Sequence, residues 1–264
     1  WSNRNPDISQ RGVARPTETP ACPAHLDWDL WVGPAPSRPY HPCYHPFAWR
    51  GWWDFGTGVL GDIGCHELSA IFKAMKIGHP VSVEACSTNW QRPKEISEET
   101  APLASITHYR FAASETHGPL SIFWYDGGMR PPTPEEIVRD DKGLPAEGMM
   151  FVGDKGKILG GFRCENPRLL SQRAAGELSE NTARSPRAWE HGSSWIETFR
   201  SGKPNCGDFT LAGPISDAFN LAAISLRLGG QRLIWDAAGS KSANPESANG
   251  YLTREYREGW ELTA

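Results

Sequence analysis

The pattern of apolar positions divides the chain into an irregular N-terminal part and a regular remainder. From Gly58 to Met75, apolar residues recur every three or four positions, which predicts a helix that stops before Gly78 and Pro80. Apolar and β-branched runs predict strands at 81–86, 104–111, 120–125 and 231–235, and a hairpin at 148–159 that turns at 154–156. Further helices are expected at 187–201, 210–228 and 245–255, and a surface loop at 171–186.

The order of these elements determines the expected fold class. Strands that follow one another and are then followed by helices, without βαβ alternation, are typical of an α+β fold. We therefore expect an open, mostly antiparallel sheet with helices on one face, and no Rossmann domain in the chain. Residues 1–50 are rich in proline and aromatic residues and lack periodicity, so we expect an extended arm packed on a domain of residues 51–264.

Composition excludes several classes of protein. A net charge of −4 gives no electrostatic signature of nucleic-acid binding, and no apolar run reaches the roughly 18 residues of a membrane span, so neither partner is expected. The six cysteines form no CxxC pair, which argues against a zinc ribbon or a redox dithiol, and no metal site is expected. Trp1 is not an initiator residue, so the sequence is expected to be a processed product or an excised piece.

The 12 tryptophans are many for this length and have two interpretations. Large aromatic side chains fill cores, and their faces also stack on sugar rings. We expect Trp195, Trp235 and Trp260 to be core or interface residues.

Candidate chemistry concentrates between His41 and His66. Asp62 and His66 are four residues apart and share one face of the expected helix, where a carboxylate and an imidazole can act as an acid–base pair or form an ordinary surface pair. The candidates for sugar contact, by hydrogen bonding or stacking, are Arg50, Asp54, Trp52, Trp53, His45, Tyr44 and Trp124. Each of these seven could instead serve local packing or a turn.

The run Gly56–Gly61 matches GxGxxG, the dinucleotide-binding pattern. That pattern has meaning only after a buried strand within a βαβ unit, and no such strand precedes it here. We therefore expect these glycines to permit close backbone approach, and we expect no cofactor to bind this chain alone.

The segments Gly56–Gly58 and Gly61–His66 resemble the GGG…DxGxH motif that opens the second domain of Gfo/Idh/MocA oxidoreductases. A bacterial subgroup of that family is also similar at five further segments, which are Leu26–Pro36, Trp49–Asp54, Trp124–Gly128, Phe151–Gly156 and Tyr256–Trp260. The resemblance covers residues 1–262 and implies the C-terminal, substrate-binding domain of an NAD(P)-dependent sugar or polyol oxidoreductase. It implies that Asp62 orients the substrate and that His66 moves its proton.

The chain departs from the family pattern because it contains no Glu-Lys-Pro motif and no Rossmann domain. The resemblance therefore implies that NAD or NADP serves the complete enzyme, that this chain alone is inactive, and that a nucleotide-binding domain is a missing partner. It also implies a homo-oligomer formed through the free sheet face, in the periplasm after twin-arginine export or in the cytoplasm. Two alternatives stay open: NAD-assisted non-redox glycoside cleavage, and a non-catalytic carbohydrate-binding or oligomerisation module.

Overall fold

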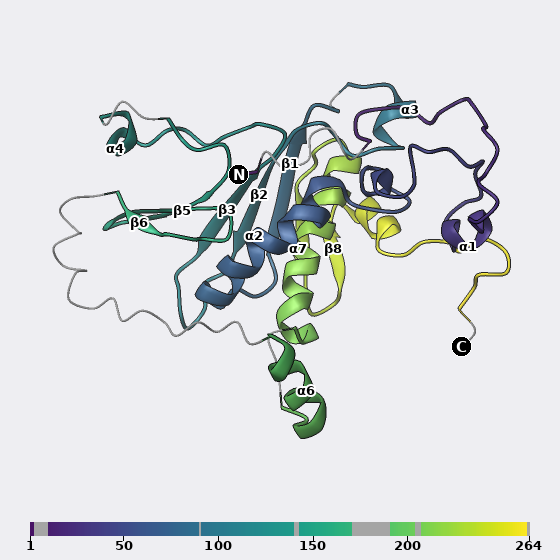
Figure 1. Ribbon diagram of the computed structural model, residues 1–264. Helices are drawn as coiled ribbons and strands as arrows, with labels where there is room; N and C mark the ends of the chain where they lie inside the picture. The colour runs from purple at the N-terminus through teal and green to yellow at the C-terminus, as the bar shows by residue number, and fades with distance from the viewer. Residues whose placement is uncertain (3–9, 90, 140–142, 171–190, 204–206, 263–264) are drawn as a thin grey trace.

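The computed structural model describes residues 1–2, 10–89, 91–139, 143–170, 191–203 and 207–262. Its central feature is a five-stranded, fully antiparallel sheet in the order β3-β2-β1-β7-β8 (Figure 1). The strands are β1 (Ser82–Ser87), β2 (Ser105–Phe111), β3 (Leu120–Tyr125), β7 (Leu233–Asp236) and β8 (Lys241–Asn244). This architecture confirms the expected α+β class.

Alternation of side chains gives the sheet one buried face. Val83 and Ala85 of β1 lie opposite Tyr109 and Thr107 of β2, and all four are buried. The residues between them point to the other face, where Phe123 of β3 is exposed. A period of two is the expected signature of a strand buried on one side only.

Two long helices cover the buried face, α2 (Gly58–Met75) and α7 (Phe209–Arg227), and they pack against each other (Figure 1). Asp208 caps α7 by accepting a hydrogen bond from the Thr210 amide at 2.7 Å. Ser225 of α7 joins the helix to the sheet, because its hydroxyl accepts from the Ala85 amide at 3.0 Å. The apolar stripe of α2, which includes Ile63, Leu68 and Phe72, is thereby buried.

Helix α7 corrects one expectation from the sequence. By length and composition it is the one described helix that could cross a membrane, so the expectation that no segment is long and apolar enough was wrong. Within this fold, 44% of its apolar window is buried. The helix contacts β1 and α2, which is the position of a core helix.

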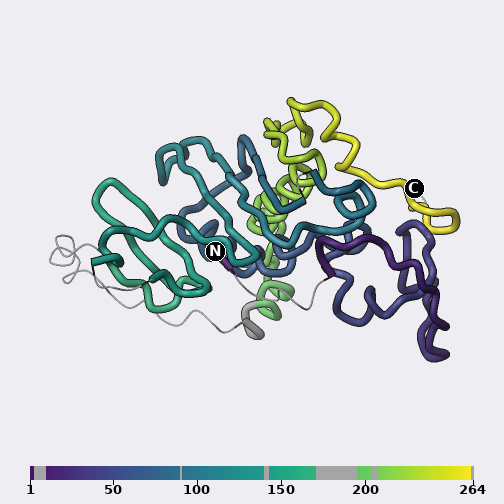
Figure 2. Tube along the Cα trace, turned by 90° about the horizontal axis from the view of Figure 1, so that it is seen from above, coloured from purple at the N-terminus to yellow at the C-terminus, as the bar shows by residue number. Residues whose placement is uncertain are grey.

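A second, smaller antiparallel sheet lies beside β3 (Figures 1 and 2). It consists of β4 (Met149–Gly153), β5 (Gly156–Gly160) and β6 (Arg168–Leu169). Trp1, Ile137, Leu144 and Leu159 form its own small core. The sequence predicted the hairpin but not its separation from the main sheet.

Short elements complete the chain. They are α1 (Trp28–Val32), η1 (Ala48–Gly51), α3 (Lys94–Ser97), α4 (Glu135–Val138), α6 (His191–Ser201) and η2 (Glu246–Tyr251). The helix expected at 245–255 is a 3₁₀ helix of six residues, Glu246–Tyr251, and the loop expected at 171–186 lies outside the described residues. Of the helix expected at 187–201, the structure describes the part from His191 onward.

The N-terminal segment lies along the domain rather than apart from it. Gly12 donates to the Ala101 carbonyl at 2.9 Å, and Thr100 exchanges hydrogen bonds with both backbone groups of Val13. Arg11 is buried and donates to the Leu103 carbonyl at 3.2 Å. Further along, α1 and η1 are stabilised by aromatic contacts, including a stacked Trp28–Trp31 pair. These hydrogen bonds join residues 11–13 to residues 100–103, whereas the Trp28–Trp31 contact lies within α1.

Candidate functional site

Helix α2 presents Asp62 and His66 one turn apart on the side opposite its buried stripe. The Asp62 side chain keeps 19% of its surface exposed, and His66 is exposed. Among the described residues, no hydrogen bond joins Asp62 to His66. Each side chain contacts an arginine from another segment instead, so the expected pairing of the two within the helix is replaced by two separate contacts.

Arg50 holds Asp62. Its Nε lies 2.9 Å from Asp62 Oδ1, and its Nη1 donates to the Phe47 carbonyl at 3.0 Å. The guanidinium also stacks over the rings of Phe47, at 3.9 Å, and Trp49, at 4.5 Å. The two rings hold the flat faces of the guanidinium, and the two hydrogen bonds hold its N–H groups. The result is a carboxylate whose charge is balanced and whose second oxygen stays available.

Arg163 contacts His66 from the segment after β5. Its Nη2 lies 3.4 Å from His66 Nδ1, and the ring of Phe162 lies 6.3 Å from the His66 ring. A guanidinium can only donate, so a hydrogen bond across this contact requires His66 Nδ1 to accept. Arg163 could not be recognised as a partner of His66 from the sequence, because the two residues are 97 positions apart. The one available signal was its position directly after a predicted hairpin.

Cys65 is the nearest other nucleophile on α2. Burial, together with the Asp62 carboxylate, raises the pKa of its thiol. A thiol with a raised pKa stays protonated at neutral pH and is a poor nucleophile. This geometry therefore favours proton transfer and hydrogen bonding over covalent catalysis.

Four of the aromatic candidates lie in the core. Tyr44, Trp52, Trp53 and Trp124 are at most 8% exposed. The three indoles also donate inward, to the Cys43 carbonyl, the Ser97 carbonyl and the Asp126 carboxylate. A ring that stacks on a sugar needs an open face, so this placement argues for packing rather than sugar contact.

Trp195, in contrast, is 65% exposed and therefore is not a core residue of the described fold.

Asp54 and His45 both contact residues of the N-terminal arm. Asp54 pairs with Arg38, and its backbone carbonyl accepts from Arg254 at 2.9 Å. His45 makes an edge contact with the Trp31 ring, at 5.9 Å between centroids. Of the seven sugar-contact candidates, Arg50 is thus the one that the structure brings to Asp62.

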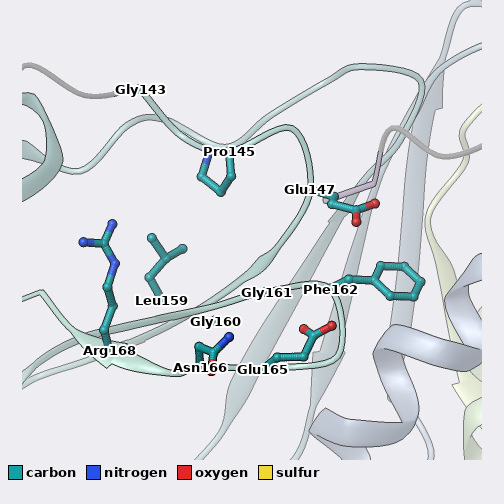
Figure 3. Close-up of a pocket in the computed structure, with 10 residues that line it drawn as sticks. All are labelled: Gly143, Pro145, Glu147, Leu159, Gly160, Gly161, Phe162, Glu165, Asn166 and Arg168. Carbon is teal, nitrogen blue, oxygen red and sulfur yellow. The ribbon is translucent and has the colours of Figure 1, made fainter.

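A cavity of about 610 Å³ opens at the turn that follows β5 (Figure 3). Phe162 and Glu165 line it, and they belong to the same turn that carries Arg163 to His66. Glu147 lines it as well (Figure 3). Acidic and aromatic side chains at such a cavity suit a polyhydroxylated molecule, because carboxylates accept from hydroxyl groups while a ring covers apolar C–H faces.

The glycine-rich run before α2 does not fit a dinucleotide. It follows η1 and a turn, so the parallel strand that the fingerprint requires is missing. Its close approaches are used within the chain. A Cβ at Gly56 would lie 2.6 Å from the Arg50 carbonyl oxygen, and one at Gly58, where φ is +65°, would lie 2.6 Å from the Ala101 Cβ. These glycines therefore shape the entry to α2 rather than a phosphate cradle.

No metal centre is formed by the residues that the structure describes. Among them, no three His, Cys, Asp or Glu side chains lie close enough together to hold an ion.

Comparison with known proteins gives one family. Residues 12–98 match the family model described as "Oxidoreductase family, C-terminal alpha/beta domain", of the Gfo/Idh/MocA type. No curated protein matches the chain. The matched segment contains Arg50, Asp62 and His66 and the whole of α2, whereas Arg163 lies outside it. Residues 12–98 are thus similar to the C-terminal alpha/beta domain of Gfo/Idh/MocA oxidoreductases, and the antiparallel sheet with helices on one of its faces is consistent with such a domain.

Proposed function

We propose that this chain is the substrate-binding and proton-relay domain of an NAD(P)-dependent sugar or polyol oxidoreductase. The observation that carries the proposal is the pair Asp62 and His66, one turn apart on α2, each held by an arginine from a different segment. Because the glycine-rich run does not fit a dinucleotide, a separate nucleotide-binding domain supplies the hydride acceptor. In this proposal, residues of this chain take no part in the hydride transfer itself.

Within that proposal, the two side chains have different roles. Asp62, held by Arg50, accepts a hydrogen bond from a substrate hydroxyl through its second oxygen and so orients the reacting carbon. His66 exchanges a proton with the reacting hydroxyl, and its contact with Arg163 sets which ring nitrogen carries the proton. The turn that carries Arg163, with Phe162 and the cavity beside it, holds the remainder of the polyol.

A binding panel tests the proposal. Aldoses, sugar acids and acyclic polyols are titrated into the chain while the His66 imidazole resonances are followed by NMR. We expect one ligand class to shift these resonances saturably, and we expect Asp62→Asn to weaken that binding about tenfold, which corresponds to about 1.4 kcal/mol. Lys73→Ala, an exposed change on the same helix, is the matched control. If no polyol shifts the resonances, or if Lys73→Ala matters as much as Asp62→Asn, the proposal fails.

We also propose that the open face of the main sheet joins copies of this chain. Phe123 is 52% exposed on that face and stacks on His108 at 4.2 Å between ring centroids. Ile234 is exposed there too, next to an ion pair between Arg232 and Glu84. Apolar side chains mixed with paired charges on a flat face are suited to a symmetric interface.

A further inference from the structure

The backbone next to Arg50 is packed against the N-terminal arm at Gly51. Gly51 ends η1 and directly follows the arginine that holds Asp62. A Cβ at Gly51 would overlap the Gln10 carbonyl oxygen and would lie 2.6 Å from the Gln10 carbonyl carbon. Both are backbone atoms, so only a glycine at this position lets the arm lie this close to η1. The position of Arg50 is therefore coupled to the position of the arm.

A short series of hydrogen bonds joins η1 to the arm through the segment before β2. The Ala101 amide donates to the Gly51 carbonyl at 2.8 Å, and the Ala101 carbonyl accepts from the Gly12 amide at 2.9 Å. The neighbouring Thr100 hydroxyl donates to the Val13 carbonyl at 2.8 Å. The segment before β2 therefore lies between η1 on one edge and the arm on the other.

Arg11 contacts both of the segments that flank the arm. Its Nη1 donates to the Leu103 carbonyl at 3.2 Å and to the Pro102 carbonyl at 3.5 Å. A Cβ at Gly51 would lie 3.1 Å from Arg11 Cγ, so the aliphatic stem of Arg11 packs directly against the residue that follows Arg50. One buried side chain thus links the arm, η1 and the segment before β2.

The buried guanidinium of Arg11 is poorly compensated by its surroundings. Among the described residues, no carboxylate forms an ion pair with it, and its Nε has no hydrogen-bond partner. Burial lowers the pKa of Arg11, whereas the charges of Asp126 and Asp62 act against that lowering. A buried cation without an ion pair is costly to desolvate. Packing alone therefore does not account for an arginine here, whereas a role in placing Arg50 beside Asp62 does.

We propose that Arg11 is a positioning residue of the candidate site, which holds η1 in place and so keeps the Arg50 guanidinium on the Asp62 carboxylate. The proposal rests on the proposed role of Asp62 in orienting the substrate. Arg11 acts through Arg50 and not by contact with the substrate. Without Arg11, η1 loses its packing partner at Gly51, and Asp62 loses the donor that fixes one of its oxygens.

The contact between Arg50 and Asp62 can be measured without any ligand. In protein labelled with ¹⁵N-arginine, hydrogen exchange of the Arg50 Nε–H reports whether this donor is bonded, and Asp62→Ala gives the rate for the unbonded state. Arg11→Met keeps an aliphatic stem and removes the donors, and we expect it to speed this exchange at least about tenfold. An exchange rate equal to that of the wild type would overturn the proposal.

Three further variants separate positioning from a general loss of packing. Arg92→Met is the matched control, because it removes another arginine that donates to the arm, at the Gly12 carbonyl over 3.1 Å. We expect it to leave the exchange at Arg50 unchanged. Arg11→Lys keeps a long stem with a cationic donor and should hold the rate within about threefold of the wild type.

Arg11→Gln is too short to span the same segments and should speed the exchange as Arg11→Met does. It keeps the proposal testable if Arg11→Met does not fold, which circular dichroism shows. Equal acceleration by Arg92→Met and the Arg11 variants would make the effect one of arm packing and would contradict the positioning role.

A double-mutant cycle on binding separates this proposal from the proposed function. D-glucose, D-gluconate and D-sorbitol represent the three ligand classes of the panel, and the His66 resonances are the readout. We expect Arg11→Met to weaken binding several-fold in the wild type and to add nothing in Arg50→Gln. Losses that add in the double variant would overturn the positioning role and leave the proposed function intact. Binding of none of the three would contradict the proposed function, while exchange at Arg50 would still decide whether Arg11 places that residue.

Discussion

The Asp126 carboxylate joins the end of β3 to the start of β2. It is 3% exposed and accepts three hydrogen bonds, from the Ser105 amide at 2.9 Å, the Ser105 hydroxyl at 2.7 Å and the Trp124 indole at 3.1 Å. Burial raises the pKa of this carboxyl, while these donors oppose the rise. The side chain therefore contributes to stability through hydrogen bonding and also through its protonation state.

Replacing Asp126 by Asn should destabilise the fold by about 1–3 kcal/mol, because an amide nitrogen at the position of Oδ2 cannot accept from the Trp124 indole. Urea unfolding monitored by tryptophan fluorescence measures this loss. Asp154→Asn in the exposed β4–β5 turn is the matched control and should cost less than about 0.5 kcal/mol. Equal losses in the two variants would contradict the assigned role of Asp126.

The same group predicts a pH dependence. Its folded pKa is above the ordinary 3.8, so folding takes up a proton in the window between the two values. The contribution of this group to stability is therefore complete below the ordinary value and is lost as pH rises through the folded pKa. The difference in unfolding free energy between the wild type and Asp126→Asn should therefore fall as pH rises above the ordinary value of 3.8. A difference that is flat with pH would contradict it.

At the residue scale, the sequence predicted the positions of candidates better than their roles. The spacing of Asp62 and His66 correctly put both on one helix. The aromatic residues could be read as either stacking or packing, because the burial of Trp52 or Trp124 depends on segments far away in the chain. The contact of Arg163 with His66 could not be predicted from spacing at all, since it depends on how the smaller sheet lies against α2.

At the scale of elements, alternation predicted β1, β2 and β3 to within a residue. Strands β6 and β8 were missed, because β6 has only two residues and the sequence of β8, Lys241–Asn244, has no apolar alternation. Helix α2 ends at Met75, before the predicted stop at Gly78, because Lys76 adopts a left-handed conformation with φ of 51° and closes the helix.

The open face of the main sheet, which includes β3, is expected to join copies of the chain. If this face joins copies, light scattering should give an oligomer for the wild type, and Phe123→Asp should convert it to a monomer, because a carboxylate would be buried at the interface. Leu30→Asp changes an exposed apolar residue on α1, and this control should leave the mass unchanged. A monomeric wild type at all concentrations, or an unchanged mass for Phe123→Asp, would exclude this face as the interface.

At the scale of the whole molecule, the order of strands and helices was enough to predict the α+β class and the covered face. The separate smaller sheet could not be predicted, because its position depends on hydrogen bonds between distant segments, of Trp1 with Gly148 and of Ser2 with Tyr125. The glycine-rich run was expected in a loop before the helix, whereas α2 begins at Gly58, so Gly58 and Gly61 lie in its first turn, with no strand ahead of them. Its glycines approach Arg50 and Ala101 closely, which explains the match to the GxGxxG pattern without a nucleotide.

The central claim is that this chain supplies the substrate side of an oxidoreductase and not the nucleotide side. Calorimetric titration of NAD and NADP into the chain, with and without the polyol identified by the binding panel, tests it most directly. We expect no saturable heat from either nucleotide, a saturable heat from the polyol, and loss of the polyol heat in His66→Ala with the fold intact by circular dichroism. Stoichiometric nucleotide binding to the chain alone would contradict the account, and would place a cofactor site in a chain whose glycine-rich run does not fit one.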